Sequence, residues 1–197
     1  MIAFLKGKLV HQEPTQVIID VNGIGYQVSI SLFTFSQIKD QENIMLHTHL
    51  TIREDAHLLF GFSTEAEKKL FQMLISVNGV GPSTAMVMLS YMGSNELKSA
   101  IVSEDAVTLQ SIKGIGGKTA QRVIIDLRDK LKKESWEESQ PSISLGPHNT
   151  MRREALSALL TLGLSKAIAE KSVDAALKKS GNTITLEDLV KQALKNA

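Results

Sequence analysis

Two copies of a short glycine pattern contain the residues with the most definite chemistry in this chain. Gly79-Val-Gly81 and Gly114-Ile-Gly116 lie 35 residues apart, and each is followed by Thr-Ala after the same interval. Two glycines separated by one residue allow a tight turn and a close approach of another molecule. A helix that starts after such a turn presents unpaired N–H groups and the positive end of its dipole, which suits a phosphate. We interpret the pair as a site that binds a nucleic-acid backbone.

Polar side chains follow each glycine pair at positions suited to phosphate contact. In the second copy, Lys118 and Thr119 fall in the first turn of the following helix, and Arg122 falls one turn later. In the first copy Ser83 takes the position of Lys118. Such groups contact phosphates rather than base edges, so binding should be independent of DNA sequence and sensitive to salt. The alternative is that Gly-x-Gly only makes a tight turn between helices, but the duplication favours a shared binding role.

The segment Gly117-Lys118-Thr119 also resembles the end of the phosphate-binding loop of an ATPase. That loop requires another glycine five residues before Gly117, and position 112 is isoleucine. It also requires a preceding strand, whereas residues 103–111 have a helical pattern. The sequence therefore argues against an ATPase.

No other group of residues has the composition of a catalytic or metal site. His47 and His49 would share one face of a strand, but the chain has no cysteine and no acidic cluster accompanies them. No Ser-His-Asp arrangement stands out beyond chance. We therefore expect a protein that is not an enzyme and that has no metal or other cofactor.

The overall composition sets further limits. The chain has 197 residues, a hydrophobic fraction of 43% and a net charge of +1, which is ordinary for a globular protein. No apolar run approaches the roughly 18 residues that span a bilayer, and the N-terminus lacks a signal-peptide core. We therefore expect a cytoplasmic location and no membrane association. The net charge is −2 over residues 1–64, +3 over 65–133 and 0 over 134–197, so nucleic-acid binding would be local.

The N-terminal third has the alternation of β-strands. Residues 1–8, 16–21, 26–30 and 44–52 alternate apolar and polar side chains, and residues 58–62 form a fifth, short strand. Asn22-Gly23 between residues 16–21 and 26–30 predicts a hairpin. Five strands with a weakly helical insert near residues 32–39 predict an oligonucleotide-binding (OB) type barrel over residues 1–63, and an SH3-like barrel stays open.

The remainder has helical periodicity. Thr64 and Glu67 form a capping box, and residues 64–133 predict an all-α domain whose last helix covers residues 118–133. Ser94 and Ser103 are expected to cap two short helices, 95–102 and 104–111. Residues 134–149 contain two prolines and lose periodicity, as in a flexible linker. Residues 150–197 predict three short helices, too few to bury a large core. The fold class is thus multidomain α+β.

At the level of the whole chain, these features resemble the RuvA family, the DNA-binding subunits of the bacterial Holliday-junction branch-migration machine. The resemblance rests on the Val-x-Gly-Ile-Gly-Tyr hairpin of residues 21–26, the Arg-Glu-Asp-Ala segment of residues 53–56, the two helix–hairpin–helix motifs and the terminal three-helix unit. Family members commonly have lysine where this chain has Ser83. That departure weakens the phosphate contact expected from the first hairpin.

The resemblance implies an assembly and partners. It implies a homotetramer, in some members paired into an octamer, that holds a Holliday junction open on its hairpins. Glu54 and Asp55 match the family's acidic pin, which keeps strands apart at the crossover. The third domain resembles the part that docks on the RuvB ATPase, with contacts assigned to Leu162, Leu164 and Ile168. The RuvC resolvase is a further implied partner. The alternatives are a general duplex-binding repair protein with the same hairpins, or an enzyme such as a nuclease.

Overall fold

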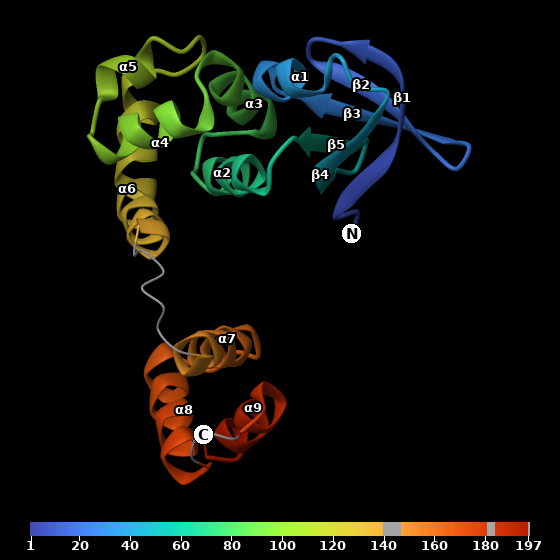
Figure 1. Cartoon of the computed structure of the whole chain (residues 1–197). Coiled ribbons are helices and arrows are strands. Elements are labelled where there is room, and N and C mark those ends of the chain that lie inside the picture. Colours follow the sequence, from blue (N-terminus) through green and yellow to red (C-terminus); the bar gives the residue numbers. More distant parts are fainter. Residues whose placement is uncertain (140–146, 181–183, 197) are drawn as a thin grey trace. The chain divides into compact units, whose positions relative to one another are not determined.

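The computed structural model describes residues 1–139, 147–180 and 184–196, which fall into two compact units, Met1–Glu138 and Ser139–Ala197. The first unit contains a β-barrel and the hairpin helices, and the second contains three further helices (Figure 1). None of the helices in the described ranges has the length and apolar character needed to cross a membrane.

Five strands close into a barrel with the order β1-β2-β3-β5-β4. They are β1 (Phe4–Glu13), β2 (Gln16–Val21), β3 (Ile24–Ile30), β4 (Asn43–Ile52) and β5 (His57–Phe62). The β3–β5 pair is parallel and the other pairs are antiparallel. Asn22 and Gly23 have φ of 53° and 87°, so the hairpin predicted from Asn-Gly is confirmed. The five-stranded barrel predicted from the sequence is also confirmed.

Six helices accompany the barrel in the first unit. They are α1 (Leu32–Ile38), α2 (Glu65–Ile75), α3 (Pro82–Tyr91), α4 (Ser94–Val102), α5 (Ala106–Gln110) and α6 (Gly117–Ser139). An aromatic cluster joins the barrel to these helices: the ring of Phe71 on α2 lies 5.1 Å from Phe60 and 4.9 Å from Phe62 on β5, measured between centroids. The core of the helices is therefore continuous with one end of the barrel, which fixes the hairpins relative to β5.

A buried carboxylate also connects the two parts of this unit. Glu67 on α2 is fully buried, and it accepts hydrogen bonds from Ser31 Oγ (2.5 Å) and Thr34 Oγ1 (2.7 Å) on the segment of α1. Thr64 caps α2, as predicted, by accepting from the N–H of Glu67 (3.2 Å). The second half of the predicted capping box, a bond from the Glu67 side chain back to Thr64, was wrong, because the Glu67 oxygens accept from the hydroxyls of Ser31 and Thr34 instead.

Several helix boundaries differ from the sequence prediction, and α7 (Pro147–Thr161) begins within the predicted linker. Helix α6 continues to Ser139, so the first six residues assigned to the linker are helical. Gly93, not Ser94, is the N-cap of α4, and Asp105 caps α5 by accepting from Thr108 N. Ser103 is the C-cap of α4. Of the predicted linker, residues 140–146 lie outside the described residues, and so does the side chain of Trp136.

The second unit is a small three-helix bundle. It contains α7 (Pro147–Thr161), α8 (Lys166–Ser180) and α9 (Leu186–Lys195). Its core is formed by small and aliphatic side chains, among them Leu159, Val173 and Leu189. Arg152 on α7 donates to both carboxylate oxygens of Asp174 on α8, at 2.7 and 3.0 Å. This bidentate pair lowers the pKa of Asp174. It also joins α7 to α8 by a polar contact, in addition to the small apolar core.

Candidate nucleic-acid interface

The duplicated pattern adopts the same backbone geometry twice. Gly79 and Gly114 both have left-handed φ, 93° and 91°. In the first copy Val80 N donates to Val77 O at 3.1 Å, and in the second Ile115 N donates to Ile112 O at 3.0 Å. The first intrahelical bonds of α3 and α6 also correspond, each 2.9 Å and accepted by the carbonyl of the second glycine. The internal repeat predicted from the sequence is therefore a repeat of structure.

The apolar residue between each pair of glycines explains why the turns face outward. Val80 and Ile115 are only 4% and 5% exposed, so they anchor the turns in the core. The flanking glycines are exposed, and their N–H groups have no hydrogen-bond partner among the described residues. Four unpaired donors at the surface, next to two helix N-termini, suit phosphate oxygens.

A cleft brings the two motifs together. It has a volume of about 440 Å³ and is lined from the first turn by Asn78 and Gly79 and from α6 mainly by Lys118, Thr119 and Arg122. Four of the residues selected from the sequence thus share one surface. Sequence reasoning missed other lining residues, namely Asn78, Gln121, Ile125 and Asp126. The sequence did contain a signal for Asn78, because this residue directly precedes Gly79 of the repeat.

Ser83 lies on a different surface from this cleft. It lines a second groove, of about 610 Å³, between the barrel and α3. The other lining residues include Leu32 from the barrel side and Met86, Val87 and Tyr91 from α3. The groove is mainly apolar, and Lys118 does not line it. The structure therefore does not place Ser83 beside Lys118.

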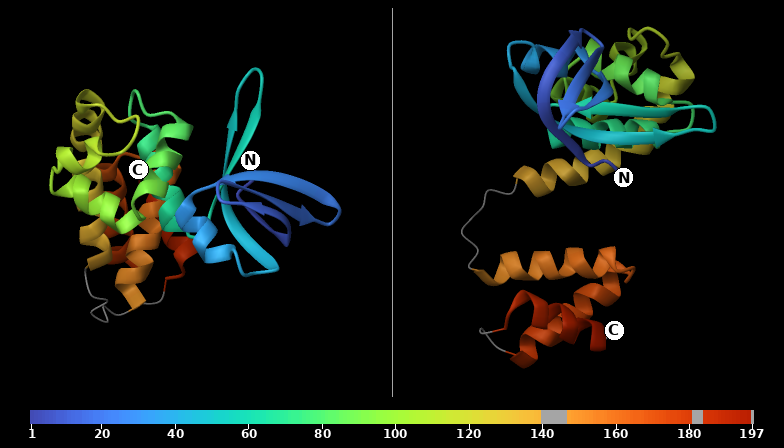
Figure 2. Two further views of the ribbon diagram at one scale, coloured as in Figure 1. Left: turned by 90° about the horizontal axis from the view of Figure 1, so that it is seen from above. Right: turned by 90° about the vertical axis from the view of Figure 1, so that its right-hand side faces the viewer.

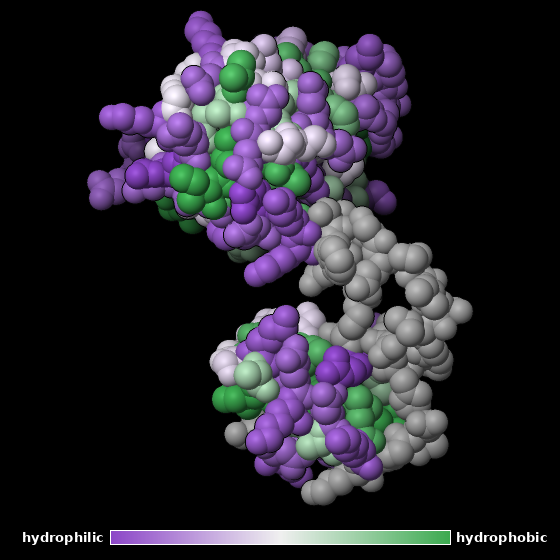
Figure 3. Space-filling view, turned by 90° about the vertical axis from the view of Figure 1, so that its left-hand side faces the viewer, coloured by the Kyte–Doolittle hydropathy of each residue, from purple (hydrophilic) through white to green (hydrophobic). Residues whose placement is uncertain are grey.

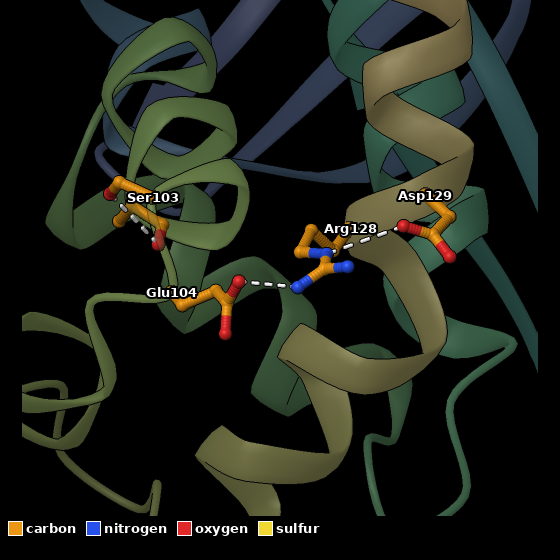
Figure 4. A network of polar contacts seen from close by, with 5 residues as sticks. Ser103, Glu104, Arg128 and Asp129 are labelled. Carbon is orange, nitrogen blue, oxygen red and sulfur yellow. Dashed lines mark hydrogen bonds and ion pairs between the residues drawn. The ribbon is translucent and has the colours of Figure 1, made fainter.

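The cations of the cleft differ from the neighbouring Arg128. Lys118 and Arg122 are exposed and form no ion pair within the part of the chain that the structure describes. Arg128, two turns along α6, binds Asp129 and Glu104, which lies at the α4–α5 turn (Figure 4). The hydrogen bonds that the Arg128 guanidinium donates to Asp129 and Glu104 raise its pKa. Arg128 therefore has a structural partner, whereas the cleft cations have none among the residues described.

The surface around these helices is suited to a polar ligand. Seen from the side on which α4, α5 and α6 lie in Figure 1, the first unit shows mostly hydrophilic side chains with scattered hydrophobic ones (Figure 3). This face is largely hydrophilic (Figure 3), which suits a charged backbone better than an apolar partner.

Glu54 and Asp55 lie at the tip of a projecting hairpin. Strands β4 and β5 pair as far as Ile52 and His57, and the connection is closed by Arg53 N donating to Ala56 O at 2.8 Å. The hairpin extends beyond the rest of the barrel (Figure 2). Both carboxylates are exposed and have no ion-pair partner among the described residues, so this tip is an acidic protrusion.

The residues assigned to a partner contact in the second unit differ in exposure. Leu162 is 60% exposed and Ile168 is 46% exposed. Leu164 is half-buried and packs on the core of the bundle. The structure therefore leaves Leu162 and Ile168 available at the surface, and Leu164 contributes to stability.

Comparisons with known families match nearly the whole chain. The model described as RuvA N terminal domain matches residues 1–61, and the model described as SAM-like helix-hairpin-helix tandem matches residues 71–129. The model described as RuvA, C-terminal domain matches residues 150–197. The three matches follow the barrel, the hairpin helices and the three-helix bundle.

Full-length relatives agree with these matches. The Holliday junction branch migration complex subunit RuvA of Cytophaga hutchinsonii is 54% identical over 198 residues, covering 99% of each chain. The proteins of the same name from Christiangramia forsetii and Flavobacterium psychrophilum are each 48% identical, over 99% and 100% of both chains. Identity at this level over the full length leaves no doubt about descent, and the chain belongs to the RuvA family.

Proposed function

We propose that this protein binds Holliday junctions as a non-enzymatic subunit and recruits the RuvB ATPase, which drives branch migration in recombination and DNA repair. The observation that carries the proposal is the cleft in which the turn of one helix–hairpin–helix motif faces Lys118 and Arg122 of the other. The names of the relatives, subunits of a Holliday junction branch migration complex, support the same activity.

The hairpins contact the DNA backbone. Exposed N–H groups of Gly79, Gly81, Gly114 and Gly116 donate to phosphate oxygens, and Lys118 and Arg122 add charge. Thr119 adds a hydroxyl donor at the edge of the cleft. None of these groups reads a base edge, so the protein distinguishes DNA by the geometry of its arms and not by sequence.

The acidic tip acts at the centre of the junction. A homotetramer brings four copies of Glu54 and Asp55 to the point where the strands exchange, and their charge repels phosphates there. Two tetramers paired face to face would form an octamer around the same junction. Exposed apolar side chains on α3, such as Val87 and Tyr91, support association between copies.

Each domain has a separate role. Residues 1–63 carry the pin, residues 64–133 bind DNA, and residues 150–197 dock on RuvB, with Leu162 and Ile168 as the surface contacts and Leu164 as their support. RuvC acts on the same junction. Because the ligand is chromosomal DNA of a bacterium, the protein works in the cytoplasm.

Affinity for DNA of two shapes tests the proposal. A fluorescent four-way junction and a linear duplex of equal composition are titrated with the protein at physiological salt. We expect the junction to bind more tightly, and equal affinity would overturn junction recognition. Cleavage of the junction with magnesium, or ATP hydrolysis by the protein alone, would show an enzyme instead.

Removal of residues 150–197 tests the docking assignment. The first unit has its own core, so junction binding should persist. Stimulation of RuvB ATPase on junction DNA should be lost. If stimulation survives the deletion, RuvB docks elsewhere.

A further inference from the structure

The projecting hairpin between β4 and β5 carries apolar surface as well as its two carboxylates (Figure 2). Ile52 is the last residue of β4, and its side chain is 64% exposed. His57 is the first residue of β5, and it is also exposed. The two residues pair directly across the hairpin. The acidic role assigned to the tip uses neither of these side chains.

The pairing of Ile52 with His57 places both side chains on one face of the hairpin. Residues that lie directly opposite each other in an antiparallel pair project to the same side of the sheet. Arg53 N donates to Ala56 O, so the next pair, Ile52 and His57, is of the kind without mutual hydrogen bonds, in which side chains approach most closely. The isoleucine and the imidazole ring therefore form one small surface, which we call the hairpin platform.

The face that carries the hairpin platform continues into the core of the barrel. Leu50 and Leu59, which pair two residues further in, lie on this face and pack in the barrel core. On the opposite face of the hairpin, Leu58 packs against the core of the helices. The platform is thus an extension of the apolar lining of the barrel to a place where Ile52 and His57 are exposed.

The charges beside the hairpin platform select the part of DNA that can lie on it. Glu54 and Asp55 are within three residues of both platform residues, and carboxylates repel a phosphate. Arg53, the only lysine or arginine of residues 52–57, projects to the opposite face because side chains alternate along a strand. A base that has left its pair is uncharged and presents a flat face. Proteins hold such bases on aromatic rings, including histidine, and on apolar side chains.

We propose that Ile52 and His57 form a platform for an unpaired base at the crossover of the junction. The proposal rests on the proposed function, in which the acidic tip lies at the point of strand exchange. Each step of branch migration breaks one base pair before another forms, so a base there is transiently without its partner. The carboxylates keep the backbones apart, and the platform covers one face of the base. Because every base has such a face, the contact is independent of DNA sequence.

A cycle that changes both protein and DNA tests the hairpin platform. One immobile four-way junction is complete, and a second lacks the base of the nucleotide next to the crossover on each strand. Affinities of the full-length protein for both are measured by fluorescence anisotropy at physiological salt. Ile52→Thr keeps a β-branched residue in the strand but removes apolar surface, and His57→Ser removes the ring. We expect each variant to bind the complete junction about fivefold or more weakly than the wild type. Both should bind the base-free junction like the wild type, because the partner of the platform is already absent.

Two control variants accompany this cycle. Ile24 follows the turn of the β2–β3 hairpin and is 59% exposed, so Ile24→Thr makes the same chemical change at another hairpin and should leave the affinity for both junctions unchanged. His57→Phe keeps a flat ring and should retain wild-type affinity for the complete junction. Because the substituted side chains are exposed, all these variants should unfold at the wild-type temperature when followed by circular dichroism.

Two results would overturn the inference. Equal loss of affinity on the complete and the base-free junction would assign Ile52 and His57 to a contact between protein copies or to the shape of the hairpin. Wild-type affinity of Ile52→Thr and His57→Ser for both junctions would show that no base rests on the platform. Failure of the proposed function has a different signature: the wild type would bind the complete junction and a linear duplex equally, whatever the variants do.

Discussion

Alanine at the four hairpin glycines should separate folding from DNA binding. At Gly79 and Gly114 a Cβ atom would meet nothing within 4 Å, so the cost is that of left-handed backbone alone. That cost is about 1–2 kcal/mol for each residue, which lowers the thermal midpoint by roughly 3–8 °C in a unit of this size. We therefore expect Gly79→Ala and Gly114→Ala to lower the stability of the fold.

Gly81 and Gly116 provide the matched pair. Gly81 has φ of −84°, neither residue is left-handed, and a Cβ atom meets nothing within 4 Å at either position. The weaker N-cap offered by alanine and its smaller unfolded-state entropy should offset to within about 0.5 kcal/mol. The added methyl group, however, occupies the space that a phosphate would take. Loss of one charge-assisted hydrogen bond corresponds to about 1.5–3 kcal/mol, or roughly 10- to 150-fold in affinity.

The assay combines thermal unfolding, followed by circular dichroism, with junction binding followed by fluorescence anisotropy at 20 °C. We expect Gly116→Ala to melt like the wild type and bind poorly, and Gly114→Ala to melt earlier. Wild-type affinity of Gly116→Ala would refute the close approach of phosphate to the turn. A large loss of stability in Gly116→Ala would refute the assignment of strain to the first glycine alone.

Three further predictions concern the rest of the first unit. Neutralising the tip with Glu54→Gln and Asp55→Asn should keep or tighten duplex binding but alter RuvB-driven branch migration; loss of binding to all DNA would argue against a pin. Glu67→Ala leaves the O–H donors of two buried hydroxyls without their acceptor and should cost about 2 kcal/mol or more in urea unfolding. Glu67→Gln should cost less, and equal costs would contradict the hydrogen-bond explanation. Burial, and then the charge of Lys68, lowers the pKa of His49, so the unfolded chain takes up the proton first as pH falls. The contribution of His49 to stability should be complete above about pH 6.5 and should decline below it. His49→Gln should remove that decline. A pH profile of the variant that matches the wild type would contradict the pKa shift.

Local signals in the sequence predicted the barrel and the hairpins well. Asn22-Gly23 determines a turn by its own backbone preferences, and the alternation of residues 16–21 is sufficient to assign a buried face. The Gly-x-Gly repeat was visible because the same turn geometry needs the same residues twice. The buried state of Val80 and Ile115 follows from that pattern as well.

Features that depend on tertiary contact were harder to predict. Glu67 looks like a local cap in the sequence, but Ser31 and Thr34, more than 30 residues earlier, compete for its oxygens in the folded chain. The end of α6 was placed too early because the composition becomes polar after Lys133. No glycine or proline interrupts the sequence until Pro141, so the helix has no local reason to stop.

The position of Ser83 shows the same limit within the site. Its place in the repeat, equivalent to that of Lys118, suggested a phosphate contact, yet it lines the groove between the barrel and α3. The sequence gives the equivalence of the two positions but not the direction in which each helix faces. Asn78, from the turn itself, is the residue that shares the cleft with Lys118.

The most direct test of the central claim is to observe the hairpin amides in the complex. The chain has 13 glycines, so a protein labelled with ¹⁵N only at glycine gives a simple amide spectrum, which single alanine variants assign. On addition of a four-way junction, we predict large shifts at Gly79, Gly81, Gly114 and Gly116 and none at Gly61, where even a Cβ atom would collide with Val28 and Leu46 inside the barrel. Unchanged hairpin glycines at saturating junction would contradict the claim that these turns hold the DNA backbone.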